Sequence, residues 1–240
     1  AVSDLHPADL AQIMSDLTPE ERQDFFEKLD TETAAEALHE LEPEVQADLI
    51  LVTHAHSDHM GDALALAREH GAPVISNYDL CTYLDAQGAP RTSGMNLGGT
   101  QEACGVHISM VRADHSSGFF HDGLPVYGGL AAGFVVRGDG WSFYFAGDTA
   151  LFSDMGLIAE LYHPQLAFLP IGDHFTMDPR QAALACRYLG VRQVVPIHWG
   201  TFAMLRGRPA DLERELRAAG LATEVVQLVP GAVWKWSPQA

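Results

Sequence analysis

The pattern of apolar and polar positions divides the chain into two parts. Residues 1–48 contain no Gly, have few β-branched residues, and are rich in Glu, Asp, Leu and Ala. Thr18 followed by Pro19, with Glu21 three positions after the Thr, is typical of a helix start. We expect short helices over residues 7–17, 19–29, 32–41 and 43–50. Their lengths and a weak internal repeat predict a small α-solenoid or an array of helical hairpins.

From residue 49 onward, short apolar runs alternate with helical patterns. This alternation predicts an α/β layered domain over residues 49–240, distinct from the all-α helical-repeat segment of residues 1–48. The expected strands are residues 49–53, 73–76, 106–111, 133–137, 141–146, 166–170, 193–197, 224–228 and 233–236. The expected helices are residues 61–70, 79–87, 154–161, 179–189 and 209–219.

Composition and charge restrict the classes of protein to consider. The 240 residues are 47% hydrophobic, which is enough for a sizeable core. No apolar run approaches the ~20 residues of a membrane span, and no signal-peptide pattern opens the chain, so we expect no membrane association. The three cysteines are widely spaced and odd in number, which favours a reducing, cytoplasmic location. The formal net charge of −18 argues against a nucleic-acid partner.

The strongest chemical signal is the sequence Thr-His-Ala-His-Ser-Asp-His at residues 53–59, directly after an expected strand. Strand ends are where a rigid scaffold commonly presents functional groups. Three histidines and one aspartate in a tight turn can converge on one or two metal ions, because imidazole and carboxylate are usual ligands of zinc and its neighbours. A polar turn that is rich in His by chance is the alternative.

Four further polar motifs follow expected strands in the same way. Each one alone is explained by a structural hydrogen bond, but together they predict the rim of an active site. They are centred on Asp114-His115-Ser116, Gly147-Asp148, Asp173-His174 and His198.

The motif HAHSDH, with a later His, a GD motif and a final PIH, resembles the metallo-β-lactamase superfamily over about residues 47–236. The stretches MNLGGT, ADHSSG, GGLAAGFVV, FAGDT, LPIGDHFTM and PIHWGTF are similar to a family of metal-dependent hydrolases related to ascorbate-6-phosphate lactonases. The resemblance implies an α/β fold of the αββα sandwich type. It also implies a hydrolase that uses a metal-bound hydroxide on an ester, lactone or phosphoester of a small molecule.

The resemblance further implies two divalent metal ions, with zinc expected first and manganese, nickel or iron as alternatives. The first ion would be held by three imidazoles, those of His54, His56 and His115. The second would be held by one carboxylate and two imidazoles, those of Asp58, His59 and His198. Asp148 would bridge the two ions, and Asp58 would also hold a proton of the attacking water.

Other residues near these motifs are candidates for contact with the substrate. His174 matches no metal ligand of the superfamily, so it could bind an oxyanion, protonate a leaving group or orient a ligand imidazole. Asp173 stands beside it. Asn96, Ser116 and Thr201 are candidate hydrogen-bond donors of the pocket, with turn or capping hydrogen bonds as the alternative.

The first part of the chain departs from the superfamily pattern. The stretch HPADLAQIMSDLTPEERQDFFEKLD resembles the N-terminal helical domain of MgtE-type magnesium transporters, and it stands where the superfamily places its first strands. We therefore expect an incomplete first sheet, covered by these helices or by a second subunit of a homo-oligomer. The competing functional hypothesis is a non-catalytic metal-binding or regulatory protein whose helical segment contacts a partner. A nuclease is disfavoured by the net charge.

Overall fold

The computed structural model describes residues 13, 47–229 and 232–238 of the chain. The helices predicted over residues 1–48, their resemblance to a transporter domain and the division into two domains therefore lie almost wholly outside the described residues. Residues 47–49 are not helical, and a strand begins at Ile50, so the predicted end of the fourth helix is wrong. No helix of the described residues is long and apolar enough to cross a membrane.

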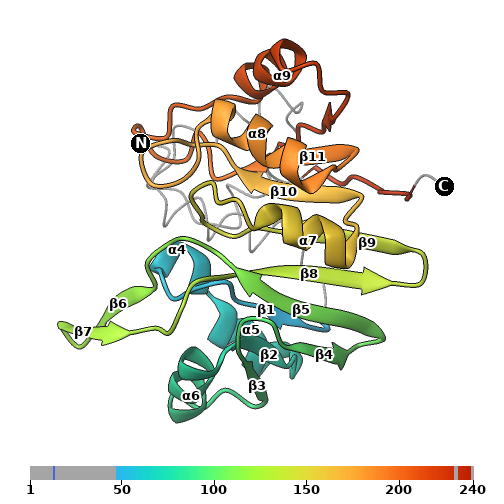
Figure 1. The fold of residues 1–240 in the computed structure, drawn as a ribbon. Coiled ribbons are helices and arrows are strands. Elements are labelled where there is room, and N and C mark those ends of the chain that lie inside the picture. The colour runs from blue at the N-terminus through green and yellow to red at the C-terminus, as the bar shows by residue number, and fades with distance from the viewer. Residues whose placement is uncertain (1–12, 14–46, 230–231, 239–240) are drawn as a thin grey trace.

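The first sheet contains three parallel strands in the order β1-β2-β3, which are Ile50–Leu51, Val74–Asn77 and Thr92–Met95. Its outer face is covered by α5 (Ala63–His70) and α6 (Tyr78–Ala86), with the short α4 (Ser57–Met60) after β1 (Figure 1). Buried side chains of β2, α5 and α6 form the core between sheet and helices, namely Val74, Ala67, Leu80 and Leu84.

The second sheet contains seven strands in the order β12-β11-β10-β9-β8-β5-β4. The strands from β4 to β9 pair antiparallel, and those from β9 to β12 pair parallel. Their bounds are Thr100–Ala103 (β4), Val106–Arg112 (β5), Ala132–Gly138 (β8), Trp141–Phe145 (β9), Leu166–Pro170 (β10), Gln193–Ile197 (β11) and Glu224–Val225 (β12). The helices that follow these strands are α7 (Met155–Tyr162), α8 (Pro179–Leu189) and α9 (Pro209–Ala218).

The two sheets pack face to face, which confirms the predicted αββα sandwich. Successive residues of a strand point to opposite faces, so Ile108 and Met110 of β5 meet Ile75 of the first sheet. Val111 and Val135 point the other way and join the core under α7 and α8. The helices of the second sheet lie on the side remote from the first, as Figure 1 shows.

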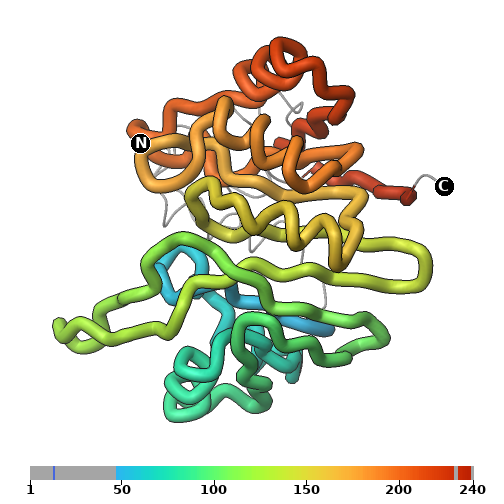
Figure 2. Tube along the Cα trace, viewed as in Figure 1, coloured from blue at the N-terminus to red at the C-terminus, as the bar shows by residue number. Residues whose placement is uncertain are grey.

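A two-stranded hairpin extends from the body of the molecule between β5 and β8 (Figure 2). Its strands are β6 (Gly118–His121) and β7 (Leu124–Tyr127), and they pair antiparallel. Asp122 and Gly123 turn the chain with positive φ angles of 51° and 76°, as a type I′ hairpin turn requires. The predicted elements did not include this hairpin.

Two predictions near the end of the chain need correction. The strand expected over residues 224–228 is only the two-residue β12, and residues 233–236 form no strand. Trp236 docks through its side chain instead. Its indole Nε1 donates to Gln193 Oε1 at 3.0 Å, and its ring lies edge-on to Trp141 at 6.3 Å between centroids. Docking of a single side chain of this kind cannot be predicted from the alternation of apolar and polar residues.

Candidate metal centre

The carboxyl ends of several strands meet at one edge of the sandwich. β5 and β9 are each antiparallel to β8, and β10 and β11 are parallel to β9, so these four strands end on the same side. His115 follows β5, Asp148 follows β9 and His198 follows β11. The other predicted ligands come from the first sheet, in the segment after β1, and are His54, His56, Asp58 and His59.

Asp148 lies at the centre of this group. Its Oδ2 atom is 3.2 Å from His198 Nε2, 3.4 Å from His59 Nε2 and 3.6 Å from His115 Nε2. The carboxylate is 3% exposed. A single buried carboxylate oxygen is therefore close to imidazoles that come from both sheets.

The potential ligand atoms form three overlapping groups, each with all its atoms within 4.8 Å of one another. The first group consists of His54, His56 and His115. The second consists of Asp58, His59 and His198. The third links them through His54, His59 and Asp148. The chain thus brings all seven predicted ligands into one cluster, although no two of its four sequence segments are adjacent in the chain.

The surrounding residues orient the imidazoles. Thr53 Oγ1 lies 3.1 Å from His54 Nδ1, which leaves Nε2 of His54 to face the cluster. Ser116 Oγ lies 3.2 Å from His56 Nε2. Hydroxyl contacts of this kind fix the ring orientation of metal-binding histidines.

Burial and nearby carboxylates set the protonation of the cluster. Burial, with His59 close by, lowers the pKa of His54 to about 3, so this imidazole is neutral at neutral pH, as metal ligation requires. Burial acts in the same direction on His59, but Asp148 and Asp58 outweigh it and raise the pKa of His59 to about 9. The neighbouring His198 and His59 hold the pKa of Asp58 well below its usual range.

Two buried atoms indicate that these residues fit a bound metal ion. His59 Nε2 and Asp148 Oδ1 are buried, and neither makes a hydrogen bond among the described residues. The carboxylate oxygens nearest to His59 Nε2, those of Asp58 and Asp148, are each 3.4 Å away. An unsatisfied buried polar atom costs about 1–3 kcal/mol. Divalent cations between these groups would satisfy both atoms, and imidazole with carboxylate is a suitable ligand set.

A pocket of about 1010 Å³ opens onto the cluster. Its polar lining includes His56, Asp58, His115, Asp148 and His198. The apolar part of its lining was missed by the sequence analysis, and it consists of Phe175, Phe202 and Met204. These residues lie within the motifs HFTM and HWGTFAM. Large apolar residues directly beside the polar rim motifs were therefore the sequence signal that could have predicted this lining.

The residues predicted to contact a substrate differ in whether they line this pocket. Ser116 lines the pocket, whereas Asn96, Thr201, Asp173 and His174 are exposed and are not part of the pocket lining. The ring of His174 lies edge-on against Phe175, 4.4 Å between centroids, so His174 contacts a residue that does line the pocket. Asp173 shapes this loop, because its carbonyl accepts the amide of Phe175 at 2.6 Å.

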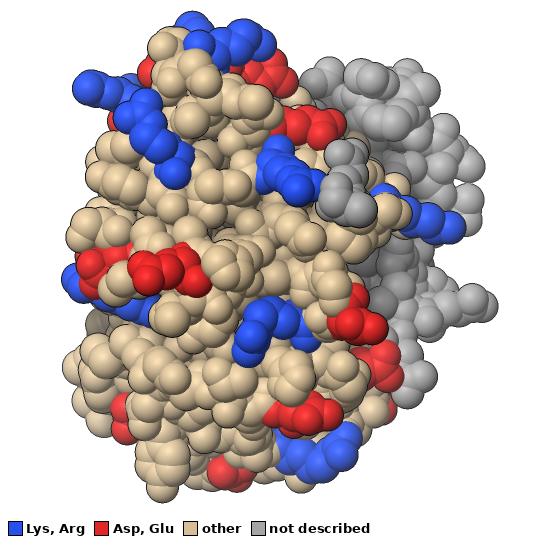
Figure 3. Space-filling model, turned by 45° about the vertical axis from the view of Figure 1, so that its right-hand side comes forward, with Lys and Arg blue, Asp and Glu red and all other residues tan. Residues whose placement is uncertain are grey.

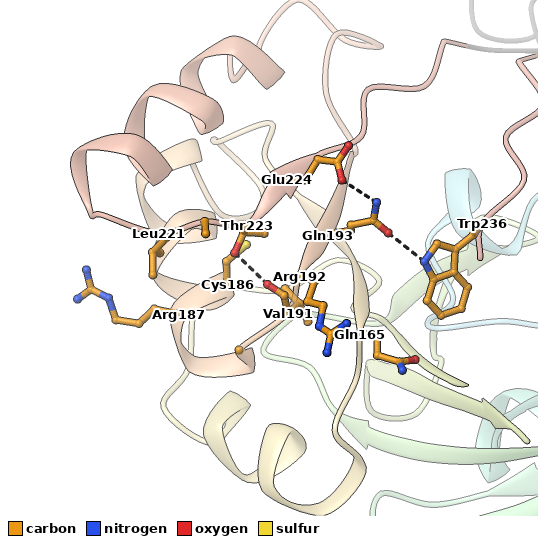
Figure 4. Close-up of a pocket in the computed structure, with 12 residues that line it drawn as sticks. Gln165, Cys186, Arg187, Val191, Arg192, Gln193, Leu221, Thr223, Glu224 and Trp236 are labelled. Carbon is orange, nitrogen blue, oxygen red and sulfur yellow. Dashed lines mark hydrogen bonds between the residues drawn. The ribbon is translucent and has the colours of Figure 1, made fainter. Parts of the chain in front are cut away.

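A second pocket, of about 500 Å³, lies at the opposite edge, where β10, β11 and β12 begin (Figure 4). Some of its polar side chains form hydrogen bonds across the pocket lining. Gln193 Nε2 donates to Glu224 at 2.8 Å, and Thr223 Oγ1 donates to the carbonyl of Val191 at 2.9 Å. These contacts tie the last strand and Trp236 to β11, so we assign this pocket a structural role.

Comparison with known proteins gives the family. The family model of the beta-lactamase superfamily domain matches residues 18–199 of this chain. This span includes all seven predicted ligands. A UPF0173 metal-dependent hydrolase of Solibacter usitatus is 47% identical over 192 residues, which cover 80% of this chain and 83% of the relative. This chain belongs to the UPF0173 metal-dependent hydrolases of the metallo-β-lactamase superfamily. A hydrolase of the same family from Methanopyrus kandleri is 45% identical over 188 residues, covering 78% and 82%.

Solved structures have the same fold as this metal-dependent hydrolase. Igni18, a metallo hydrolase from Ignicoccus hospitalis, superposes with a TM-score of 0.73 at 37% identity and covers 82% of each chain. The metallo-beta-lactamase fold protein YhfI from Bacillus subtilis has a TM-score of 0.62 at 18% identity, again over 82% of each chain. The second similarity concerns the fold alone.

Proposed function

We propose that this hydrolase binds two divalent metal ions and cleaves an ester, lactone or phosphoester bond of a small molecule. His54, His56 and His115 would hold one ion, and the other would be held by Asp58, His59 and His198. The position of Asp148 Oδ2, within 3.6 Å of imidazoles from both groups, is the observation that carries the proposal. A carboxylate between two cations reduces their mutual repulsion.

When bound, divalent cations lower the pKa of water and polarise the oxygen of a carbonyl or phosphoryl group. The chain supplies the remaining steps. Asp58 faces the pocket and would take a proton at its carboxylate. Ser116 would orient His56 and donate a hydrogen bond to the substrate. His174, together with Asp173, would act from the rim by protonating the leaving group.

Asn96 and Thr201 would bind the substrate from exposed positions outside the pocket lining. The lactone option rests on the resemblance to ascorbate-6-phosphate lactonases. Zinc is the metal we propose first, since imidazole-rich sites suit it, with manganese, nickel or iron as alternatives. Metal analysis of protein purified without chelator tests the stoichiometry, and we expect about two ions per chain. Less than one ion per chain, with no uptake of added zinc or manganese, would contradict the proposal.

We further propose that the protein is a cytoplasmic homo-oligomer that acts on a small molecule and binds neither nucleic acid nor membranes. The described cysteines are free thiols, which is consistent with a reducing compartment. On the described part of the face in Figure 3, basic and acidic side chains are interspersed. The hairpin of β6 and β7 supports self-association, because it exposes several large apolar side chains, namely Phe120, Leu124 and Tyr127.

A further inference from the structure

We propose that the substrate carries an uncharged apolar acyl or aryl group, and that an apolar wall of three residues binds this group beside the metal cluster. The wall consists of Phe175, Phe202 and Met204. This inference rests on the proposed hydrolase function and selects a class of substrate within it. It favours apolar esters and lactones over phosphorylated compounds.

The wall is built from the two loops that also form the rim of the metal cluster. Phe175 lies in the loop after β10, and Phe202 and Met204 lie in the loop after β11, a few residues beyond His198. Phe175 is 49% exposed and Met204 is 45% exposed. Large apolar side chains that are grouped in a pocket and open to water are typical of ligand-binding sites.

Backbone hydrogen bonds hold the two loops of the wall in place. The amide of Met177 donates to the carbonyl of Thr149, the residue after Asp148, at 3.2 Å. The amide of Leu205 donates to the carbonyl of Phe202 at 2.9 Å, and the Leu205 side chain is buried. One hydrogen bond therefore ties the loop after β10 to Thr149, and the loop after β11 is held by its own turn and by the buried Leu205 side chain, while Phe175 and Met204 stay exposed. A preformed apolar surface lowers the entropic cost of ligand binding.

The charge of the pocket argues against an anionic group on the substrate away from the reacting bond. None of the described residues that line the pocket is Lys or Arg, and the charged lining residues Asp58 and Asp148 are carboxylates. The nearby Arg112 contacts Asp114 and Asp154, and Arg208 lies over the ring of Trp199. Sites that bind a remote phosphate usually supply Arg or Lys for it.

The test uses the full-length, metal-loaded protein and 4-nitrophenyl esters of increasing acyl length. We expect kcat/KM to rise about tenfold or more from acetate to hexanoate, because each added methylene gains contact with the wall. The singly charged glutarate ester, similar in length to the hexanoate ester, is expected to react more slowly than the hexanoate. Equal rates for all three esters, or a faster glutarate ester, would overturn the inference.

Variants of the wall provide the matched comparison. Phe202→Ala and Met204→Ala are each expected to flatten the dependence on acyl length, mainly through KM, while metal content stays unchanged. Leu161→Ala is the control, because Leu161 is an exposed apolar residue on α7 that does not line the pocket. Retention of the full chain-length dependence in both wall variants would contradict the proposal.

A binding measurement separates this inference from the proposed function. The ethers 4-nitrophenyl hexyl ether and 4-nitroanisole cannot be hydrolysed at an ester bond, and calorimetry gives their affinities. We expect tighter binding of the hexyl ether to the wild-type protein and loss of this preference in Phe202→Ala. If the preference is present but no ester, lactone or phosphoester is cleaved, the proposed hydrolysis fails alone. If esters are cleaved without any preference for the longer chain, the apolar wall proposal fails alone.

Discussion

The two carboxylates of the proposed metal centre differ in exposure, and this difference separates their proposed roles at the residue scale. Asp148 is 3% exposed and touches imidazoles from both sheets, whereas Asp58 is 35% exposed and faces the pocket. Asp148 can therefore connect the two halves of the cluster. Asp58 remains accessible to water and to the substrate.

The substitution Asp58→Asn tests the role of the exposed carboxylate. The amide keeps the size of the side chain but loses the negative charge. We expect metal content to fall to about one ion per chain, since His54, His56 and His115 do not depend on Asp58. We expect kcat to fall by roughly 10²–10⁴, because a proton acceptor is lost. Metal analysis and ester hydrolysis measure the two effects.

The control for this variant is Asp154→Asn, because Asp154 is an exposed carboxylate outside the cluster that pairs with Arg112. Asp154→Asn should keep wild-type metal content and rate. If Asp58→Asn behaved like Asp154→Asn, then Asp58 would be neither a ligand nor a proton acceptor.

The variant His174→Ala tests whether an exposed rim residue takes part in catalysis. We expect both metal ions to remain and kcat to fall by roughly 10²-fold, as for the loss of a general acid. Metal analysis and steady-state kinetics check this result, with His107→Ala on β5 as an exposed histidine control. Loss of a metal ion would make His174 a ligand. Unchanged kinetics would reduce it to a packing partner of Phe175.

At the scale of secondary-structure elements, close packing between the strand ends positions the proposed ligands. Gly147 follows β9 and has a φ of 61°, and a Cβ atom there would lie 2.8 Å from Thr53 Cβ. Thr53 in turn contacts His54 Nδ1. The close approach of the two sheets at this point therefore requires glycine, and a larger residue there would displace Thr53 and with it the proposed ligand His54.

Gly147→Ala should lower both stability and metal affinity. The left-handed backbone conformation costs about 1–2 kcal/mol for a residue with a Cβ atom. Displacement of Thr53 adds to this cost and shifts His54. Gly190→Ala is the matched control, because Gly190 has a φ of 64° but nothing within 4 Å of the added Cβ. Denaturant unfolding and metal titration measure both variants, and equal metal affinity in the two would contradict the argument.

The strands that were predicted correctly from the sequence are those with strong apolar runs. β10 and β11 are buried on both faces and read as continuous apolar segments, so their bounds were predicted without error. β3 and β4, with the sequences TSGM and TQEA, are short and half-exposed, and no apolar pattern reveals them. The hairpin of β6 and β7 carried a usable signal, since Asp122-Gly123 between two short apolar runs is typical of a type I′ turn.

The candidate site shows a similar division. His and Asp at successive strand ends predicted the rim of the site without knowledge of packing, and the resemblance to the metallo-β-lactamase superfamily selected the seven proposed ligands from these motifs. The apolar wall was missed because Phe175 and Phe202 lie in loops, where periodicity carries no information about direction. The register in which β10 and β11 pair determines which loop side chains face the same pocket. This register cannot be predicted from the sequence alone.

At the scale of the whole molecule, the proposed metal centre connects the two sheets. The proposed ligands come from the ends of β1, β5, β9 and β11, so bound cations would contact both halves of the sandwich. A ligand that binds only the folded state, at 1,000 times its dissociation constant, stabilises a protein by about 4 kcal/mol. For a chain of this size, that corresponds to a melting temperature higher by on the order of 10 °C.

Removal of metal by a chelator should therefore lower the melting temperature by that amount, and added zinc should restore it. Differential scanning calorimetry before and after chelation measures the change, and metal analysis confirms removal. An unchanged melting temperature in metal-free protein would mean that bound metal does not stabilise the contact between the two sheets.

The hairpin of β6 and β7 provides the test of self-association. A two-stranded hairpin alone is marginally stable in water, yet this one exposes Phe120 at 77% and Tyr127 at 67%. Contact with a second subunit would bury these side chains and stabilise the hairpin. We expect Phe120→Ser with Tyr127→Ser to shift the protein toward monomer in sedimentation velocity. Leu157→Ser on α7, an exposed apolar position elsewhere, should not do so. A wild-type protein that is already monomeric at micromolar concentration would contradict the proposed homo-oligomer.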